Sequence, residues 1–192
     1  MTDVHSPPAV PPALVERVKR LIRTPSAEWE AIDAEPATVA GLFRSYVLYL
    51  AAIGPVAGLI GMVVFEHTPV IRACVLAAFG YGMSLVWVYV AGLVIDALAP
   101  RFGSFRDRLQ AAKVAVYSPT PVMVCGVFDL IPALSFISVI GLVYSFYLLW
   151  VGLPKLMRTP PERRLGYYAT FVLAMFGLGL LASMVLWPIM SV

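Results

Sequence analysis

Five long apolar runs, separated by short polar connections, dominate the pattern of hydrophobic and polar positions in this chain. They extend over about residues 43–65, 70–98, 112–128, 134–153 and 167–187. A helix rises ~1.5 Å per residue and the hydrocarbon core of a bilayer is ~30 Å thick, so such runs are typical of membrane-spanning helices. The pattern predicts an all-α fold, an integral membrane bundle of five transmembrane helices within residues 36–192.

Small residues recur on one face of the first run. Gly54, Gly58 and Gly61 are spaced by four and three residues, which places them on roughly the same side of a helix. Residues without a side chain let two helix backbones approach closely in a membrane. We therefore expect a neighbouring helix to pack against this face.

Residues 13–35 precede the spans and have an amphipathic pattern. Apolar residues recur at i, i+1, i+4, i+7 and i+8, which predicts a helix with one apolar side. That side comprises Leu14, Val15, Val18, Leu21 and Ile22, and the charged side comprises Glu16, Arg17, Lys19, Arg20 and Arg23. A cationic helix of this kind suits the surface of an anionic membrane, on the cytoplasmic side. The alternative, packing on the protein's own inner loops, stays open.

A second short helix is expected after Thr24 and Pro25, which are typical of an N-cap and a first helical residue. Trp29 in this helix suits the headgroup level of a membrane. Four carboxylates in this piece suggest a metal site, but no His or Cys stands beside them, which favours a solvated polar face (Glu28, Glu30, Asp33 and Glu35). Residues 1–12 contain four prolines and predict a disordered tail.

The composition excludes a water-soluble globule. Hydrophobic residues make up 60% of the chain and charged residues 13%, with a mean hydropathy of +0.86. The net charge of +3 does not indicate nucleic-acid binding, because the basic residues flank the spans instead of forming one patch. The two cysteines, Cys74 and Cys125, are too few for a metal cluster; a disulfide between them is conceivable, but small buried apolar side chains are the favoured interpretation.

The distribution of basic residues predicts the orientation in the membrane. From the N-terminus to the C-terminus, the connections carry 5, 1, 4, 0, 4 and 0 Lys and Arg residues, which accounts for all 14. This alternation follows the positive-inside rule. We expect a cytoplasmic N-terminus and a C-terminus on the outer side. No cleavable signal peptide is recognisable, so the first span is expected to direct insertion.

Two carboxylates at or near membrane depth are candidate functional groups. Asp96 stands about one turn from the inner end of the second span, where Arg101 or Lys113 could pair with it. Asp129 stands in the short outer turn between the third and fourth spans, where capping of the fourth helix is the favoured interpretation. The sequence contains no recognisable nucleophile with its base and no phosphate-binding glycine loop, so we predict no catalytic residue, cofactor or metal and no enzymatic activity.

The third span contains the most informative motif, Tyr117-Ser-Pro-Thr-Pro121. Pro119 and Pro121 remove two backbone donors in the middle of the span and predict a break in the helix. Ser118 and Thr120 can partly replace the missing hydrogen bonds. A broken helix beside hydroxyl groups is a candidate substrate or ion site, whereas a structural kink is the simpler interpretation.

Three stretches together resemble the bacterial branch of the Yip family. They are RVKRLIRTPSAEWEAIDAEPATVAGLFRSYVLYLAAIGP before and into the first span, AVYSPTPV in the third, and the short DLIP turn. The resemblance extends from about Val15 to the C-terminus and implies a five-span protein of the bacterial inner membrane. Eukaryotic members of the family interact with Rab GTPases and work in vesicle traffic and membrane shaping. The DLYGP motif of those members is missing here, so no Rab-type GTPase partner is expected.

Two functional hypotheses follow. The first is a non-enzymatic inner-membrane protein that acts in membrane organisation, through its amphipathic helix and bundle, by binding lipid, other membrane proteins or a second copy of itself. The second is a small transporter or channel component that uses the broken third span with Asp96 or Asp129. A continuous polar cavity that reaches Ser118 and Thr120 favours transport, whereas a tightly packed bundle favours the first hypothesis.

Overall fold

The computed structural model describes residues 14–190, with side chains to residue 184. The predicted tail at 1–12 lies outside this range. The described residues form helices and connections, without a β-strand. The α-helices are α1 (Leu14–Arg23), α2 (Pro25–Ala34), α3 (Val39–Leu42), α4 (Leu48–Leu50), α5 (Ile53–Val64), α6 (Val70–Leu98), α7 (Arg108–Tyr117), α8 (Thr120–Cys125), α9 (Ser138–Leu156) and α10 (Arg164–Met190).

Several helices join into five segments that are long and apolar enough to span a membrane. These segments are Val39–Val64, Val70–Phe102, Arg108–Leu130, Pro132–Leu156 and Pro161–Met184. A π-helical turn, Phe43–Val47, joins α3 to α4, and 3₁₀ turns extend the third and fourth segments at Gly126–Leu130 and Pro132–Ile137. The predicted fold class, an all-α bundle of five spans, is confirmed.

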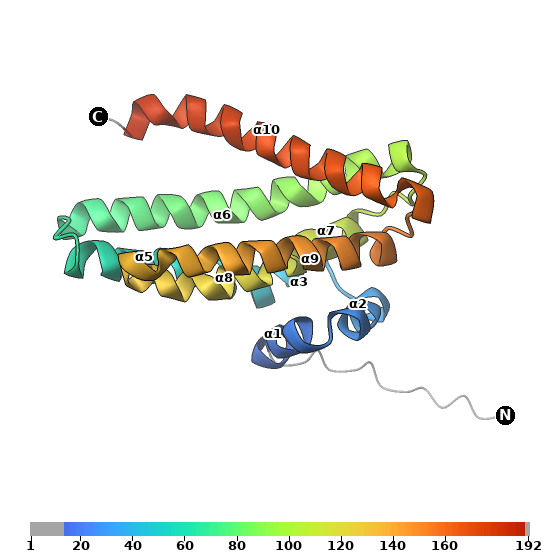
Figure 1. Ribbon diagram of the computed structural model, residues 1–192, viewed down its shortest axis with the longest axis horizontal. Helices are drawn as coiled ribbons and strands as arrows, with labels where there is room; N and C mark the ends of the chain where they lie inside the picture. Colours follow the sequence, from blue (N-terminus) through green and yellow to red (C-terminus); the bar gives the residue numbers. More distant parts are fainter. Residues whose placement is uncertain (1–13, 191–192) are drawn as a thin grey trace.

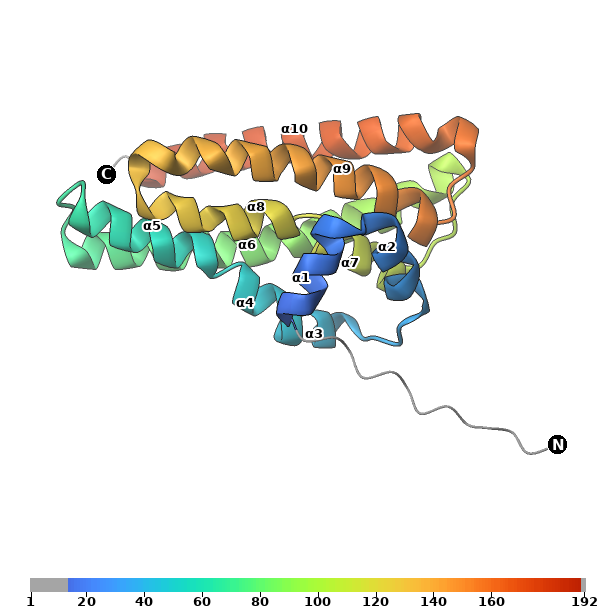
Figure 2. The same ribbon diagram turned by 60° about the horizontal axis from the view of Figure 1, so that its bottom comes forward.

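The spans lie lengthwise beside one another (Figure 1). The second span packs against the first and third, and α9 packs against α7 and α8. The last helix, α10, contacts α6 and α9 and leans away from α6 toward its C-terminal end in Figure 1. Helices α1 and α2 lie against the flank of the bundle, where Figure 2 shows α1 crossing in front of the long helices. The N-terminal segment is therefore part of the packed structure.

Two of the three glycines predicted to form a packing face do so. A Cβ atom at Gly61 would lie 2.7 Å from the carbonyl oxygen of Asp129, and one at Gly126 would lie 2.8 Å from the Cα atom of Gly54. The first span and the Gly126–Leu130 turn therefore approach closely through backbone atoms. Gly58 has no neighbour within 4 Å of its Cβ position, so the prediction is wrong there.

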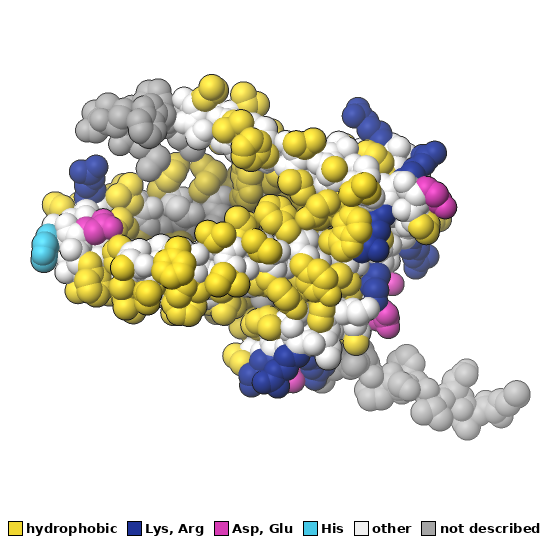
Figure 3. All heavy atoms as spheres, in the orientation of Figure 1, with side chains coloured by type: hydrophobic (Ala, Val, Ile, Leu, Met, Phe, Trp, Pro, Cys, Tyr) yellow, Lys and Arg dark blue, Asp and Glu magenta, His cyan; other side chains and the backbone are white. Residues whose placement is uncertain are grey.

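The surface is apolar over most of the length of the bundle. Hydrophobic side chains cover the spans in Figure 3, while most Lys and Arg side chains gather at one end of the bundle and on α1. Exposed fractions reach 82% for Ile71 and 69% for Leu173. A monomer in water rarely exposes so large an apolar surface, whereas lipid chains cover it without cost.

Candidate functional site

The third span is broken at Ser118 and Pro119, between α7 and α8. Pro121 has no N–H group for the carbonyl of Tyr117, one turn earlier. The Thr120 hydroxyl donates to that carbonyl over 2.7 Å, and the Tyr46 hydroxyl lies 2.8 Å from the same Thr120 oxygen. Thr120 therefore compensates for the proline, as predicted, and joins the first span to the third.

Ser118 does not compensate in the same way. Its hydroxyl oxygen is buried and has no hydrogen-bond partner among the described residues. A different serine, which the sequence reasoning did not identify, supports the break from the neighbouring span. The Ser145 oxygen in α9 accepts the N–H of Val122 over 3.2 Å, and its hydroxyl donates to the carbonyl of Gly141.

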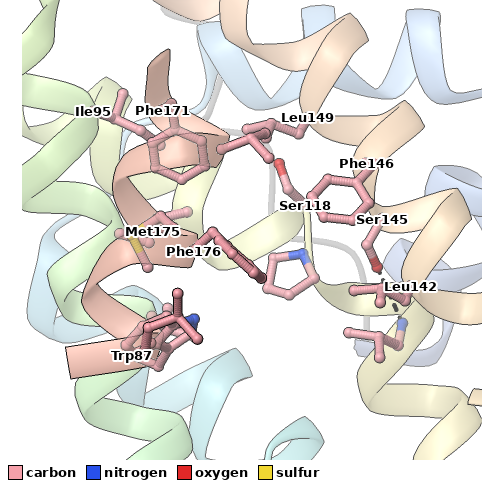
Figure 4. A pocket seen from close by; sticks show the side chains of 18 residues that line it. Trp87, Ile95, Ser118, Leu142, Ser145, Phe146, Leu149, Phe171, Met175 and Phe176 are labelled. Carbon is pink, nitrogen blue, oxygen red and sulfur yellow. Dashed lines mark hydrogen bonds between the residues drawn. The ribbon is translucent and has the colours of Figure 1, made fainter. Parts of the chain in front are cut away.

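Ser118 borders a cavity of about 470 Å³ between α6, α9, α10 and the broken third span. Figure 4 shows the Ser118 hydroxyl next to Leu149 and Phe146. The remaining lining is almost entirely apolar and aromatic, including Trp87, Phe171 and Phe176. Phe176 is 66% exposed, so the cavity opens on the flank of the bundle, the side that faces hydrocarbon in a membrane. This size and character fit a hydrophobic ligand.

Asp129 lies at the opposite end of the third span from the main cluster of basic residues. Contrary to the prediction, it does not cap the fourth helix. Its Oδ1 atom accepts a hydrogen bond from the Ser138 hydroxyl over 3.3 Å, while the N-cap position of the fourth span is Ile131, which has no side-chain cap.

Cys74 and Cys125 are both free. Cys74 is exposed, so the prediction of a buried apolar role is wrong for this residue.

Asp96 forms ion pairs near the end of the second span, but not with the predicted partners. Its Oδ2 atom lies 3.2 Å from Nε of Arg106 and 3.8 Å from Nε of Arg108. The side chain is only 5% exposed, and Oδ1 has no hydrogen-bond partner among the described residues. A carboxylate in this state has unused capacity for a donor.

Lys113, the predicted alternative partner of Asp96, binds the N-terminal segment instead. Its ammonium group donates to the backbone carbonyls of Ile32, Asp33 and Glu35, at 2.7, 3.2 and 2.8 Å. These carbonyls stand at the C-terminal end of α2, where a cation is favourable. The signal in the sequence was a lone Lys within an apolar stretch, Ala-Ala-Lys-Val-Ala.

The amphipathic helix is present as α1, but Arg17 does not lie on a solvated polar face. It is 3% exposed, pairs with Glu28 over 2.7 Å and with Glu35, and stacks on the Tyr117 ring at 5.5 Å. Glu28 and Glu35 are thus partners of Arg17 instead of a solvated acidic face. A buried guanidinium requires such pairing because the isolated charge is costly to desolvate.

The apolar side of α1 is divided between two surroundings. Leu21 is fully buried, and Leu14 and Val18 are partly buried against the same core. Val15 and Ile22 remain 61% and 43% exposed. Helix α1 therefore packs on the protein, the alternative left open above, and retains an exposed apolar strip; its charged neighbours Lys19 and Arg20 are also exposed.

Helix α2 packs against the C-terminal part of α9. The Trp29 ring occupies the space that a side chain at Gly152 would fill, and Trp29 is fully buried instead of facing lipid headgroups as predicted. Lys155 adds hydrogen bonds to Ser26 and to the Glu30 carboxylate at 2.6 Å. No group of three or more His, Cys, Asp or Glu residues that could hold a metal ion exists in the described part of the chain.

Comparison with known proteins agrees with this architecture. A family profile described as the Yip1 domain matches residues 19–184. Inner membrane protein YohC of Escherichia coli K12 is 26% identical over 159 residues, which cover 77% of this chain and 82% of that protein. YohC of Escherichia coli O6:H1 strain CFT073 gives the same values. No solved structure matches. The profile covers most of the chain, and the predicted resemblance is confirmed: the chain belongs to the Yip1 domain family.

Proposed function

We propose that this protein is a non-enzymatic, multi-pass protein of the bacterial inner membrane that binds lipid chains and takes part in membrane organisation. The names of its two Escherichia coli relatives support the location. The distribution of basic residues supports a cytoplasmic N-terminus and an outer C-terminus. The exposed apolar strip of α1, with Lys19 and Arg20 beside it, is suited to contact with lipid or another membrane protein.

The single observation that carries the proposal is the apolar cavity beside the broken third span. Its lining offers aromatic and aliphatic contacts along α6, α9 and α10 and hydroxyl groups at Ser118 and Ser145. A hydrocarbon chain from the surrounding membrane fits this lining, because burying polar or charged groups in such a cavity is unfavourable. A cavity open on the flank also admits a lipid without requiring it to leave the membrane.

Transport of a polar solute has less support. Thr120, the second hydroxyl of the proposed pathway, is fully buried and already bonded to Tyr117 and Tyr46. The cavity that reaches Ser118 is lined by apolar side chains instead of a continuous row of polar groups. The lining therefore favours binding of a chain over passage of a hydrated ion or solute.

The test uses a matched pair of glycines on α10. A Cβ atom at Gly179 would lie 3.5 Å from the Trp87 ring in the cavity, whereas one at Gly177 has no neighbour within 4 Å. The variant Gly179→Leu should fill the cavity, and Gly177→Leu should not. Native mass spectrometry of the purified protein then counts the phospholipids that each variant retains.

We expect Gly179→Leu to lose one retained lipid relative to the wild type and Gly177→Leu to keep it. Equal lipid retention in all three proteins contradicts the proposal. Solute flux through sealed vesicles that depends on Ser118 and is abolished by Gly179→Leu supports the transporter hypothesis instead.

A further inference from the structure

A second, smaller cavity lies on the other side of α6, between the start of the first span and the end of the second. It has a volume of about 200 Å³, and Val88 is the one residue that lines both this cavity and the cavity at Ser118. Its polar residues are Asp96 and Arg108, and its apolar lining includes Phe43, Tyr89 and Leu93. We propose that this cavity binds the headgroup of a phospholipid that carries both a phosphate and a primary ammonium.

The Asp96 carboxylate is buried and only partly paired. Asp96 is nine-tenths buried or more, and its Oδ1 atom has no hydrogen-bond partner among the described residues. Both arginines approach the other oxygen, Oδ2. A buried acceptor without a donor is costly. Protein atoms enclose Oδ1, so a primary ammonium in the cavity that Asp96 lines reaches a carboxylate oxygen after a rotation of the Asp96 side chain, and it then supplies up to three N–H donors.

The two arginines beside Asp96 are largely exposed. The Arg106 and Arg108 side chains are 63% and 79% exposed although both stand within 4 Å of the same carboxylate. Their guanidinium groups therefore keep donors free for an anion, and a phosphate is the anion that such groups bind well. A carboxylate next to two guanidinium groups is complementary to a zwitterion whose ammonium and phosphate are joined by a two-carbon bridge.

The cavity lies toward one end of the second span. The second span has 33 residues, and ~20 suffice to cross the hydrocarbon core, so its ends extend into the headgroup region. Asp96 lies near the C-terminal end of α6, within 4 Å of Arg106 and Arg108, and most Lys and Arg side chains of the bundle gather at one of its ends (Figure 3). Toward the middle of the span, Tyr89 and Leu93 are 52% and 44% exposed and provide an apolar surface for the acyl chains of the same lipid.

The occupant is therefore a phospholipid such as phosphatidylethanolamine, and not a free ammonium compound, which makes no use of that apolar surface. Phosphatidylcholine carries the same charges, but its trimethylated nitrogen has no N–H donor for Asp96. Phosphatidylglycerol has the phosphate but no cation. A comparison of lipids that have the same acyl chains but different headgroups therefore separates the contribution of the ammonium to binding from the contributions of the phosphate and the chains.

The experiment titrates delipidated full-length protein with dioleoyl-phosphatidylethanolamine, -phosphatidylcholine and -phosphatidylglycerol and measures bound lipid by native mass spectrometry. For the wild type we expect phosphatidylethanolamine to bind about tenfold more tightly than the other two lipids. A tenfold difference in affinity corresponds to the binding free energy of one charge-assisted hydrogen bond. Asp96→Asn should reduce this preference to about twofold or less. Glu162→Gln, which removes an exposed carboxylate from the connection before α10, should retain it.

The proposal is overturned if the wild type binds the three lipids equally, if it prefers phosphatidylglycerol, or if Asp96→Asn keeps the preference for phosphatidylethanolamine. If Asp96→Asn fails to fold, the wild type is titrated with phosphatidylethanolamine whose nitrogen is methylated stepwise. Binding must then weaken with each added methyl group, and unchanged binding overturns the proposal. Gly179→Leu, which fills the other cavity, should leave the headgroup preference unchanged. Failure of chain binding at Ser118 and failure of headgroup binding at Asp96 are thus distinguishable.

Discussion

Two neighbouring hydroxyl residues in the broken third span have opposite surroundings. Thr120 is bonded to the carbonyl left free by Pro121 and to the hydroxyl of Tyr46 in the first span. Ser118, two residues earlier, is buried without a partner. Both were predicted from the sequence as equivalent compensating groups, because the motif shows which backbone donors are missing but not which hydroxyl faces them.

Replacing these two hydroxyls should therefore have different effects on stability. Thr120→Val keeps the shape of the side chain but leaves the Tyr117 carbonyl and the Tyr46 hydroxyl without partners, at a cost of about 1–3 kcal/mol. Ser118→Ala removes a group that makes no hydrogen bond and should change the free energy of unfolding by less than about 0.5 kcal/mol. Reversible unfolding in detergent micelles measures both values. Equal destabilisation by the two substitutions contradicts this assignment.

At the scale of elements, the N-terminal segment is tied to the bundle by contacts between residues far apart in the chain. Lys113 caps α2, Lys155 binds Glu30, and Tyr144 donates to the carbonyl of Ile22. The amphipathic pattern predicted helix α1 but not the burial of Arg17, because its partners stand 11 and 18 residues later. Periodicity identifies a helix and its apolar side, whereas tertiary pairing decides which charge is enclosed.

Arg17 should be the main anchor of this segment. Arg17→Ala leaves Glu28 buried without its cation, which is expected to cost about 3–5 kcal/mol or to release α1 and α2 from the bundle. Arg20→Ala is the matched control on the same helix, because its pair with Glu16 is half exposed and contributes about 0.5 kcal/mol or less. Thermal unfolding and limited proteolysis after Arg23 measure the effect. Similar melting temperatures and cleavage rates for the two variants exclude an anchoring role.

At the scale of the whole molecule, the sequence predicted the class of fold better than the candidate sites. Five apolar runs are sufficient to predict five spans, since the length of a spanning helix depends only on the thickness of the bilayer. The cavities at Ser118 and Asp96 depend on how α10 and the first span lean against α6, which no local pattern contains. The pairing of Asp96 with Arg106 and Arg108 depends on the path of the connection after α6.

The orientation in the membrane is a further property of the whole chain and rests on charge alone. If the N-terminus is cytoplasmic, the connections α6–α7 and α9–α10 are also cytoplasmic, and the connection α5–α6 is on the outer side. Glu66 and Glu162 are exposed in the α5–α6 and α9–α10 connections, respectively.

With Cys74 and Cys125 replaced by Ser, a membrane-impermeant maleimide should label Glu66→Cys in intact spheroplasts and Glu162→Cys only after permeabilisation. The opposite labelling pattern contradicts the orientation. The expected result also places Asp96 at the cytoplasmic face, where Arg106 and Arg108 meet the headgroups of the inner leaflet.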